Sequence, residues 1–383
     1  MRILIASDSF KDALSATRVC RAIGRGLKKA GPGFSTQIFP LADGGEGTAE
    51  ILAHHLDGQM RELTVKDPLY RPHTARYLLS RDKQVAFIEM AQAAGLDLLK
   101  PAERDPLETT TWGVGELIRD AVESGAERIL LAIGGSATND AGTGMAAALG
   151  YAFLDKTGQV LEPSGKNLIR IRTIVPPKAP LAGNLRVEVL CDVSNPLFGP
   201  AGAAFVYAPQ KGADPEQVRV LDEGLRHIGD LFDRASGKSI AAMPGSGAAG
   251  GLGAGAVFFL DAVLQPGAET ILELCRFDSA LPTADLLITG EGRLDDQTLN
   301  GKLIGTLCRK ARLHQIPVVA LCGDLRLTPE KQTAAGLTAA FSIAPGPISL
   351  EEALSGTERN LEKTAEDIGR LLAISGIGRS PVG

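Results

Sequence analysis

The chain has 383 residues, of which 44% are hydrophobic and 22% charged, and its net charge is −5. This composition is typical of soluble globular proteins, and the length predicts two domains. The small negative charge, with Lys and Arg spread along the chain, argues against nucleic acid or a membrane surface as a partner. No apolar stretch approaches the roughly 18 residues needed to span a bilayer.

Five scattered cysteines, odd in number and never in CxxC spacing, argue against a disulfide framework or a zinc site. The first residues, MRILIASDSF, lack the apolar core and cleavage site of a signal peptide and predict a first strand instead. We therefore expect a cytoplasmic protein.

The N-terminal part predicts the start of a parallel sheet. Apolar runs at 3–9 and 36–42 predict strands, and apolar residues four positions apart predict a helix over 15–29 between them. A glycine-rich turn after the second strand leads into another helix. This β-α-β-α order is typical of a parallel α/β sheet.

The pattern changes in the middle of the chain. Short strand-like runs divided by turn residues predict a meander from about 58 to 90. The segments after it predict a helix at 110–124, strands at 128–133, 186–193 and 203–209, a helix at 215–236, and a glycine-dense stretch at 245–255.

The C-terminal part returns to the α/β rhythm. It predicts strands at 284–292, 317–324 and 338–344, with a last helix at 349–374. Together the two ends supply five strands for one doubly wound parallel sheet. We therefore expect one domain from residues 1–60 plus 263–383, interrupted by an inserted mixed α/β domain at 61–262.

Polar residues follow three of the predicted strands of the first domain. Ligands of parallel α/β sheets bind outside the carboxyl ends of the strands, so these residues predict one shared site. Each acid alone could instead cap a helix. The residues are Asp8, Ser9 and Lys11, then Asp43 and Glu46, then Glu291, Arg293, Asp295 and Asp296.

The inserted domain contains the loop GGSATNDAGTG at the end of a predicted strand. Closely spaced glycines let backbone N–H groups converge on an anion. The loop lacks the Gly-Lys-Ser/Thr ending of a Walker A motif. We predict that it binds phosphate through Gly134, Gly135, Ser136, Thr138 and Asn139; the alternative is a glycine-rich packing turn.

Two further segments of this domain contain polar or glycine-rich features. Asp192 and Asn195 follow the strand at 186–193, and Lys211 lies in a later glycine turn. Gly245–Gly250 matches G-x-G-x-x-G, but the run before it is a poor strand ending in proline. The match is therefore a weak dinucleotide signal, and tight packing against the sheet is its alternative.

These features together indicate phosphoryl transfer. That reaction needs a metal held by carboxylates, donors around the phosphates, and a carboxylate that orients the attacking hydroxyl. A serine hydrolase fits poorly, because no G-x-S-x-G sequence is present. Two alternatives remain open: a nicotinamide-dependent oxidoreductase acting on a hydroxy acid, which rests on Gly245–Gly250, and a non-catalytic sensor of a sugar acid.

Five motifs, spread in order over nearly the whole chain, resemble the bacterial class I glycerate kinase family of the glycerate 2-kinase type. The chain departs from that family at Asp12-Ala13, where the family reads Gly-Ser or Glu-Ser. The motifs are IASDSFKDALSA, PLADGGEGTAE, AIGGSATNDAGTGMAAALG, CDVSNPLFGPAGAAFVYAPQKGA and LLITGEGRLDDQTLNGK.

The resemblance implies ATP-dependent phosphorylation of D-glycerate to 2-phosphoglycerate with Mg²⁺. It also implies a flavodoxin-like domain interrupted by a second α/β domain, with the active site in the cleft between them. We expect a monomer or a homodimer.

Within this hypothesis each candidate residue has a role. Asp192 is the preferred catalytic base, because it ends an apolar strand, and Asp8 is the second choice. Lys11 is assigned to catalysis. Ser9, Arg293 and Asn195 are assigned to glycerate binding, and Lys211 is assigned to phosphate binding. Asp43, Glu291 and Asp295 are assigned to the metal, close to Asp8.

Overall fold

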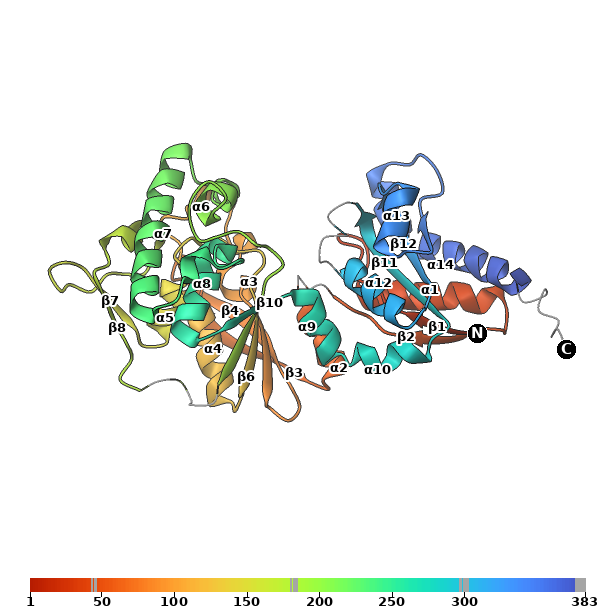
Figure 1. Ribbon diagram of the computed structural model, residues 1–383, viewed down its shortest axis with the longest axis horizontal. Helices are drawn as coiled ribbons and strands as arrows, with labels where there is room; N and C mark the ends of the chain where they lie inside the picture. Colours follow the sequence, from red (N-terminus) through yellow and green to blue (C-terminus); the bar gives the residue numbers. More distant parts are fainter. Residues whose placement is uncertain are drawn as a thin grey trace. The chain divides into compact units, whose positions relative to one another are not determined.

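The structure is a computed structural model of the chain, and it describes residues 1–42, 44, 47–179, 181, 185–295, 298 and 303–375. The chain forms two compact units (Figure 1). The first consists of Met1–Ile51 and Ala268–Gly383, and the second of Leu52–Gly267. The first unit is thus built from both ends of the chain.

The first unit contains a five-stranded sheet, all of whose strands are parallel. The strand order is β13-β12-β11-β1-β2, which is the flavodoxin-like order when the strands are numbered within this unit. The predicted fold class is therefore confirmed. The strands are β1 (Arg2–Ile5), β2 (Ser35–Ile38), β11 (Leu286–Leu294), β12 (Val318–Leu325) and β13 (Ala339–Ser342).

Helix α1 illustrates how the sequence builds this unit. Val19, Ile23 and Leu27, each four positions after the last, are fully buried in its core. A Cβ on Gly26 would lie 2.1 Å from the carbonyl oxygen of Glu362, so glycine lets α14 approach closely. The described helices assigned to this unit or reaching its boundary are α1 (Ala16–Ala30), α2 (Thr48–His55), α9 (Gly267–Leu274), α10 (Phe277–Ala280), α12 (Leu303–Leu313), α13 (Pro329–Ala335) and α14 (Leu350–Ser375).

The second unit contains a six-stranded sheet with the order β10-β9-β6-β5-β4-β3. Its β3, β4 and β5 form the predicted antiparallel meander, and the remaining pairs are parallel. The strands are β3 (Gln59–Lys66), β4 (Pro72–Leu79), β5 (Val85–Glu89), β6 (Arg128–Ala132), β9 (Arg186–Leu190) and β10 (Val263–Gln265), with a separate hairpin of β7 (Ala152–Leu154) and β8 (Thr173–Val175).

Helices complete the second unit. The predicted helix at 215–236 is confirmed as α7, whose first turn is capped by the carboxylate of Asp214, and Gly237 ends it with φ +69°. The described helices are α3 (Ala91–Ala94), α4 (Trp112–Glu123), α5 (Thr143–Ala148), α6 (Ala203–Tyr207), α7 (Pro215–Ser236) and α8 (Ala248–Leu260).

The strand predicted at 203–209 is wrong. The segment forms α6 and then a 3-10 turn over Pro209–Lys211. Ala203, Ala204 and Ala208 are buried, whereas Phe205 is 44% exposed. Burial therefore follows a helical face rather than alternate residues. A short apolar run does not distinguish the two by itself.

The two units meet at 51/52 and 267/268, whereas the expected domain limits were 60/61 and 262/263. The expected limit at 60/61 would divide β3, which begins at Gln59. The limit at 262/263 would move β10 out of the second unit, although β10 pairs with β9. This strand has only three residues, too few for a recognisable alternating pattern.

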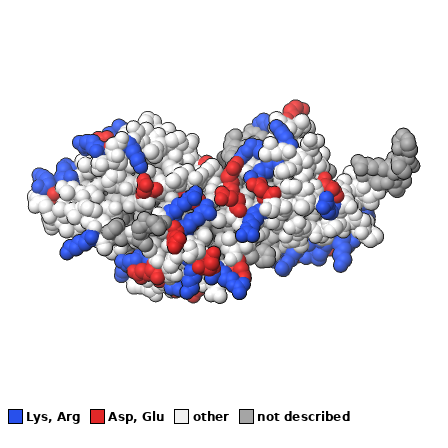
Figure 2. Space-filling model, turned by 60° about the horizontal axis from the view of Figure 1, so that its bottom comes forward, with Lys and Arg blue, Asp and Glu red and all other residues white. Residues whose placement is uncertain are grey.

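The surface and the cysteines complete the description. On the face that Figure 2 shows, Lys and Arg side chains are interspersed with Asp and Glu side chains. All five cysteines are free. Within the described ranges, the structure contains no helix with the length and apolar character needed to cross a membrane.

Candidate active site

The first candidate site lies at the carboxyl ends of β1 and β11, where the strand order of the first unit reverses. The N–H of Asp8 donates to the carbonyl oxygen of Gly290 at 3.2 Å. A Cβ on Gly292 would lie 3.7 Å from the backbone nitrogen of Lys11. The segment after β1 therefore runs beside the end of β11. This arrangement brings together five predicted site residues, Asp8, Ser9, Lys11, Glu291 and Arg293.

Hydrogen bonds orient the carboxylates at this edge. Asp8 Oδ1 accepts the N–H of Ser9 at 2.6 Å. The hydroxyl of Thr298 donates to Glu291 Oε1 and accepts the N–H of Asp295 at 3.1 Å. Thr298 thus links two predicted metal ligands, whereas the third, Asp43, lies outside the described residues, as do Glu46 and Asp296.

The cationic residues at this edge differ in their contacts. Lys11 is exposed. Arg293 Nε lies 3.3 Å from Asp324 Oδ2, which also accepts from Arg326 at 2.8 Å. Asp324 was missed by the sequence analysis, although it also follows an apolar strand run and the same strand-end rule could have found it. Asp12, where the chain departs from the family motif, has φ +63°, a conformation that glycine adopts readily.

The donors at this edge suit magnesium by their chemistry. Mg²⁺ in nucleotide-dependent enzymes is usually held by one or two carboxylates together with water and substrate phosphates. Asp8 and Glu291 provide carboxylate oxygens on neighbouring strands. The part of the chain that the structure describes contains no group of three His, Cys, Asp or Glu side chains placed to share a metal.

The second candidate site is the glycine loop between β6 and α5. Gly134 and Gly135 are exposed, and a Cβ on Gly134 would have no atom within 4 Å. Gly135 has φ +73°, which favours glycine. The N–H groups of Gly134, Gly135 and Ser136 donate to no acceptor within the described ranges. Three successive donors are therefore available to an anion.

Two sets of contacts fix the shape of this loop. Backbone hydrogen bonds join it to the segment after β5: the N–H of Leu96 donates to Gly135 at 2.8 Å, and that of Ala137 donates to Ala94 at 2.9 Å. The carboxylate of Asp140 accepts four hydrogen bonds, from the N–H and hydroxyl of Thr111 at 2.8 Å each and from the N–H groups of Gly142 and Gly144 at 3.1 Å each.

Asp140 is completely buried, and burial raises the pKa of its carboxyl group. Asp140 was not predicted as a site residue, although it lies inside the glycine motif. Its place two residues before Gly142, where an Asp side chain can accept backbone N–H groups, was the available signal.

Lys211 contacts the loop from the protein interior rather than from the solvent side. Its side chain is only 2% exposed, and Nζ donates to Ser136 Oγ at 2.8 Å and to the carbonyl oxygen of Thr138 at 2.7 Å. Burial lowers the pKa of this amine to about 7, against a weaker opposing effect of Asp140. The residue predicted to touch phosphate therefore contacts the loop itself.

Thr138 and Asn139 are fully buried. Their side-chain polar atoms, Thr138 Oγ1 and Asn139 Nδ2 and Oδ1, have no hydrogen-bond partner within the described ranges. Gly250 covers them, because a Cβ there would lie 2.0 Å from the carbonyl oxygen of Thr138. Buried polar groups usually have a partner, and a direct contact of these two side chains with nucleotide phosphate stays a prediction.

The glycine-dense stretch packs against this loop. A Cβ on Gly250 would lie 2.0 Å from the carbonyl oxygen of Thr138, and one on Gly255 would lie 2.2 Å from that of Ala141. The first turn of α8 has left-handed residues at 249–251. A 3-10 helix, not a strand, precedes the stretch. It is therefore not the strand-to-helix turn of a dinucleotide fold, which removes the basis of the oxidoreductase alternative.

Asp192 and Asn195 follow β9, the neighbour of β6. Asp192 lies two residues beyond Leu190, which pairs with Ala132 at the end of β6. It is exposed, and its Oδ1 accepts the N–H of Gly267, the first residue of α9, at 2.8 Å. Asn195 is held inside its own loop: its amide donates to Ala201 at 2.8 Å and accepts from Tyr207 at 2.7 Å.

Comparisons with known proteins find relatives that match nearly the whole chain. A sequence model of the glycerate kinase family matches residues 3–373. The chain is 43% identical to a glycerate kinase of Halalkalibacterium halodurans over 96% of this chain and 97% of that protein. It is 38% identical to glycerate 2-kinase of Escherichia coli, over 98% of both chains. A crystal structure from Salmonella typhimurium LT2, provisionally identified as glycerate kinase 2, superposes with a TM-score of 0.88 at 40% identity, covering 98% of this chain and 99% of that one.

Proposed function

Because the chain belongs to the glycerate kinase family, we propose that it transfers the γ-phosphoryl group of ATP to the 2-hydroxyl of D-glycerate. The products are ADP and 2-phosphoglycerate. The observation that supports this proposal most directly is the glycine loop, which presents the free N–H groups of Gly134, Gly135 and Ser136 at the end of a strand. Such a row of donors is suited to phosphate oxygens.

In this proposal the loop binds nucleotide phosphates through its backbone. Lys211 fixes the loop at Ser136 and Thr138, and Asp140 fixes it at Gly142 and Gly144. A preorganised set of N–H groups stabilises the charge of the transferring phosphoryl group without rearrangement during the reaction.

The edge of the first unit supplies the second set of groups. Lys11, Ser9 and Arg293 bind the carboxylate and hydroxyl of glycerate, and Asn195 is a further candidate for binding it. Asp8, Asp43, Glu291 and Asp295 are the residues that would hold Mg²⁺, which neutralises phosphate charge when it is bound.

Asp192 is the proposed base. It accepts the proton of the glycerate hydroxyl as the oxygen attacks phosphorus, and the N–H of Gly267 orients the carboxylate through Oδ1. Asp8 is the second candidate. We further propose a cytoplasmic location, which the five free thiols support.

The proposal is tested with the purified chain, ATP, Mg²⁺ and D-glycerate, by measuring ADP release. We expect release of ADP only when D-glycerate is present. We expect no oxidation of NADH when NADH replaces ATP. Binding of glycerate without ADP release would favour the sensor hypothesis. Glycerate-dependent consumption of a nicotinamide cofactor would favour the oxidoreductase.

A further inference from the structure

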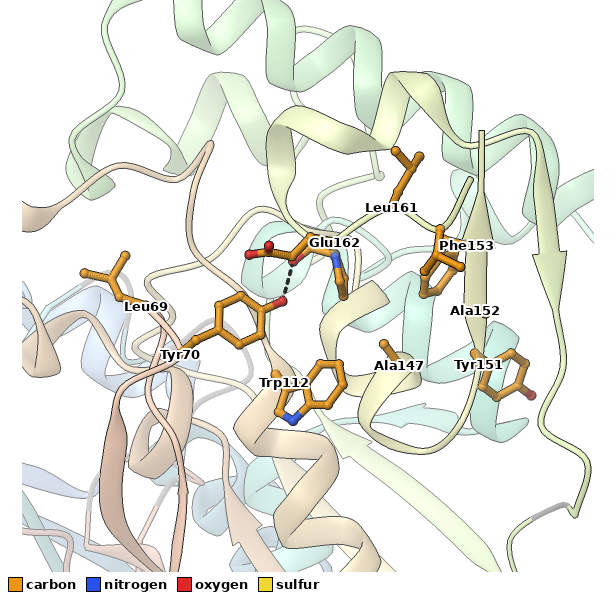
Figure 3. A pocket seen from close by; sticks show the side chains of 11 residues that line it. Leu69, Tyr70, Trp112, Ala147, Tyr151, Ala152, Phe153, Leu161 and Glu162 are labelled. Carbon is orange, nitrogen blue, oxygen red and sulfur yellow. Dashed lines mark hydrogen bonds between the residues drawn. The ribbon is translucent and has the colours of Figure 1, made fainter. Parts of the chain in front are cut away.

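An aromatic pocket of about 720 Å³ opens in the second unit. The residues that line it include the aromatic Tyr70, Trp112, Tyr151 and Phe153 and the acidic Glu162. Figure 3 shows Tyr70 and Trp112 on one side, Tyr151 and Phe153 on the other, and Glu162 near Tyr70. Nothing in the phosphoryl-transfer chemistry above uses these side chains.

The rings of this pocket are held in place by hydrogen bonds at their edges. The hydroxyl of Tyr70 donates to the carbonyl oxygen of Pro163 at 3.1 Å. The indole N–H of Trp112 donates to Glu116 at 3.1 Å. The Tyr70 and Trp112 rings lie 5.9 Å apart, tilted by 56°. Tyr70, Trp112 and Tyr151 are partly exposed, whereas Phe153 is buried behind them. Such ring faces beside one acidic residue suit a flat heterocycle that carries an amino group.

The pocket adjoins the last residues of the glycine loop. A Cβ on Gly144, whose N–H donates to Asp140, would lie 2.7 Å from the backbone nitrogen of Trp112. Ala147, which lines the pocket, lies one turn further along α5. Loop and pocket are thus joined by direct backbone contact.

The sheet places both features at the same edge. β3 is antiparallel to β4, β4 is antiparallel to β5, and β5 is parallel to β6. β3 therefore runs in the direction of β6. The turn after β3, which includes Tyr70, lies at the edge where β6 leads into the loop. The turn that carries Tyr70 and the glycine loop therefore lie at the same edge of the sheet.

We propose that the aromatic pocket binds the adenine base of the nucleotide whose phosphates contact the glycine loop, an inference that rests on the proposed function. The base stacks on the rings, and the carboxylate of Glu162 accepts a hydrogen bond from the exocyclic amino group. Guanine has a carbonyl oxygen at the equivalent ring position, where adenine has its amino group. A guanine base bound in the orientation of adenine would place this oxygen opposite the carboxylate, so the pocket favours ATP over GTP.

The single tryptophan of the chain provides a direct readout. Because Trp112 lines the pocket, ADP and adenosine should change its fluorescence in a saturable way. Inorganic tripolyphosphate, which can fill only the loop, should leave the emission unchanged. If the emission stays unchanged at ADP concentrations that saturate binding in calorimetry, the pocket does not bind the base and this proposal is wrong. ADP release with D-glycerate tests the proposed function separately, so the two can fail independently.

Two variants test the specificity. Glu162→Gln should reduce the preference for ATP over GTP in kcat/KM by about tenfold. Tyr151→Leu should raise KM for ATP several-fold and leave KM for glycerate unchanged. Phe205→Leu, on an exposed ring outside the pocket, is the matched control. An unaltered ATP/GTP preference in Glu162→Gln, with unaltered ATP kinetics in Tyr151→Leu, would contradict the proposal.

Discussion

Lys211 Nζ donates a hydrogen bond to Ser136 Oγ at 2.8 Å, joining residues 75 positions apart in the sequence. The same amine donates to the carbonyl oxygen of Thr138. A neutral amine still has two hydrogens, so both bonds survive when burial lowers the pKa of Lys211 to about 7. The lysine is thereby a positioning residue for the glycine loop.

Replacing Lys211 should change how stability depends on pH. The unfolded chain keeps this proton up to the ordinary lysine pKa of 10.5, whereas the folded chain loses it near 7. Between these values the unfolded state binds more protons, so the lysine contributes a rise in the free energy of unfolding as pH increases. Lys211→Met should lack that rise in urea unfolding at a series of pH values. Its KM for ATP should also increase. Parallel pH profiles for the two proteins would show that the amine keeps its proton in the folded state.

A side chain on Gly134 should block phosphate without disturbing the fold. Its Cβ would face open space, so Gly134→Val should raise KM for ATP at least tenfold with an unchanged melting temperature. Gly33→Val, another exposed glycine with open space around it, is the control. Gly135 is a poorer choice, because a side chain at φ +73° costs about 1–3 kcal/mol in backbone strain. Unchanged ATP kinetics in Gly134→Val would make the loop a packing turn.

Neutralising Glu291 should weaken the response to magnesium. Glu291→Gln can still accept the hydroxyl of Thr298, so thermal stability should change little. The Mg²⁺ concentration for half-maximal activity should rise about tenfold, because an amide oxygen is a weaker ligand than a carboxylate. Glu269→Gln, which removes only an exposed ion pair with Arg309, is the control. A lower melting temperature with an unaltered magnesium titration would assign Glu291 a structural role.

Asp192→Asn separates catalysis from helix capping. The amide oxygen of asparagine can accept the N–H of Gly267 as the carboxylate does, so the fold should be retained. An amide cannot accept the hydroxyl proton, and kcat at saturating ATP and D-glycerate should fall by roughly 10²–10⁴. Circular dichroism checks the fold. A kcat within about threefold of the parent would transfer the role of base to Asp8.

Local signals explain which parts of the fold could be predicted. The helix predicted at about 215–236 is α7, which the structure places at Pro215–Ser236. The local residues agree with these ends, because Asp214 and Pro215 begin the helix and Gly237 ends it. The same reasoning failed at 203–209, where a five-residue helix has no period long enough to recognise. The three-residue β10 was missed for the same reason.

The candidate site likewise has features that could be predicted from the sequence and features that could not. The approach of Asp8 to the end of β11 follows from the rule that parallel strands present their carboxyl ends at one edge. The burial of Lys211 does not follow from its neighbours in sequence. It depends on Gly212, where a Cβ would lie 2.2 Å from the carbonyl oxygen of Arg104. Such contacts between distant segments have no local pattern.

The central claim, transfer of phosphate from ATP to O2 of glycerate, is tested most directly by phosphorus NMR of the product formed from ATP, Mg²⁺ and D-glycerate. A phosphate on O2 couples to the single hydrogen of C2 and gives a doublet, whereas a phosphate on O3 couples to the two hydrogens of C3 and gives a triplet. We predict a new phosphomonoester doublet that grows as the signals of ADP appear. A triplet would contradict the assignment of O2, and the absence of any new phosphomonoester signal would contradict the kinase activity itself.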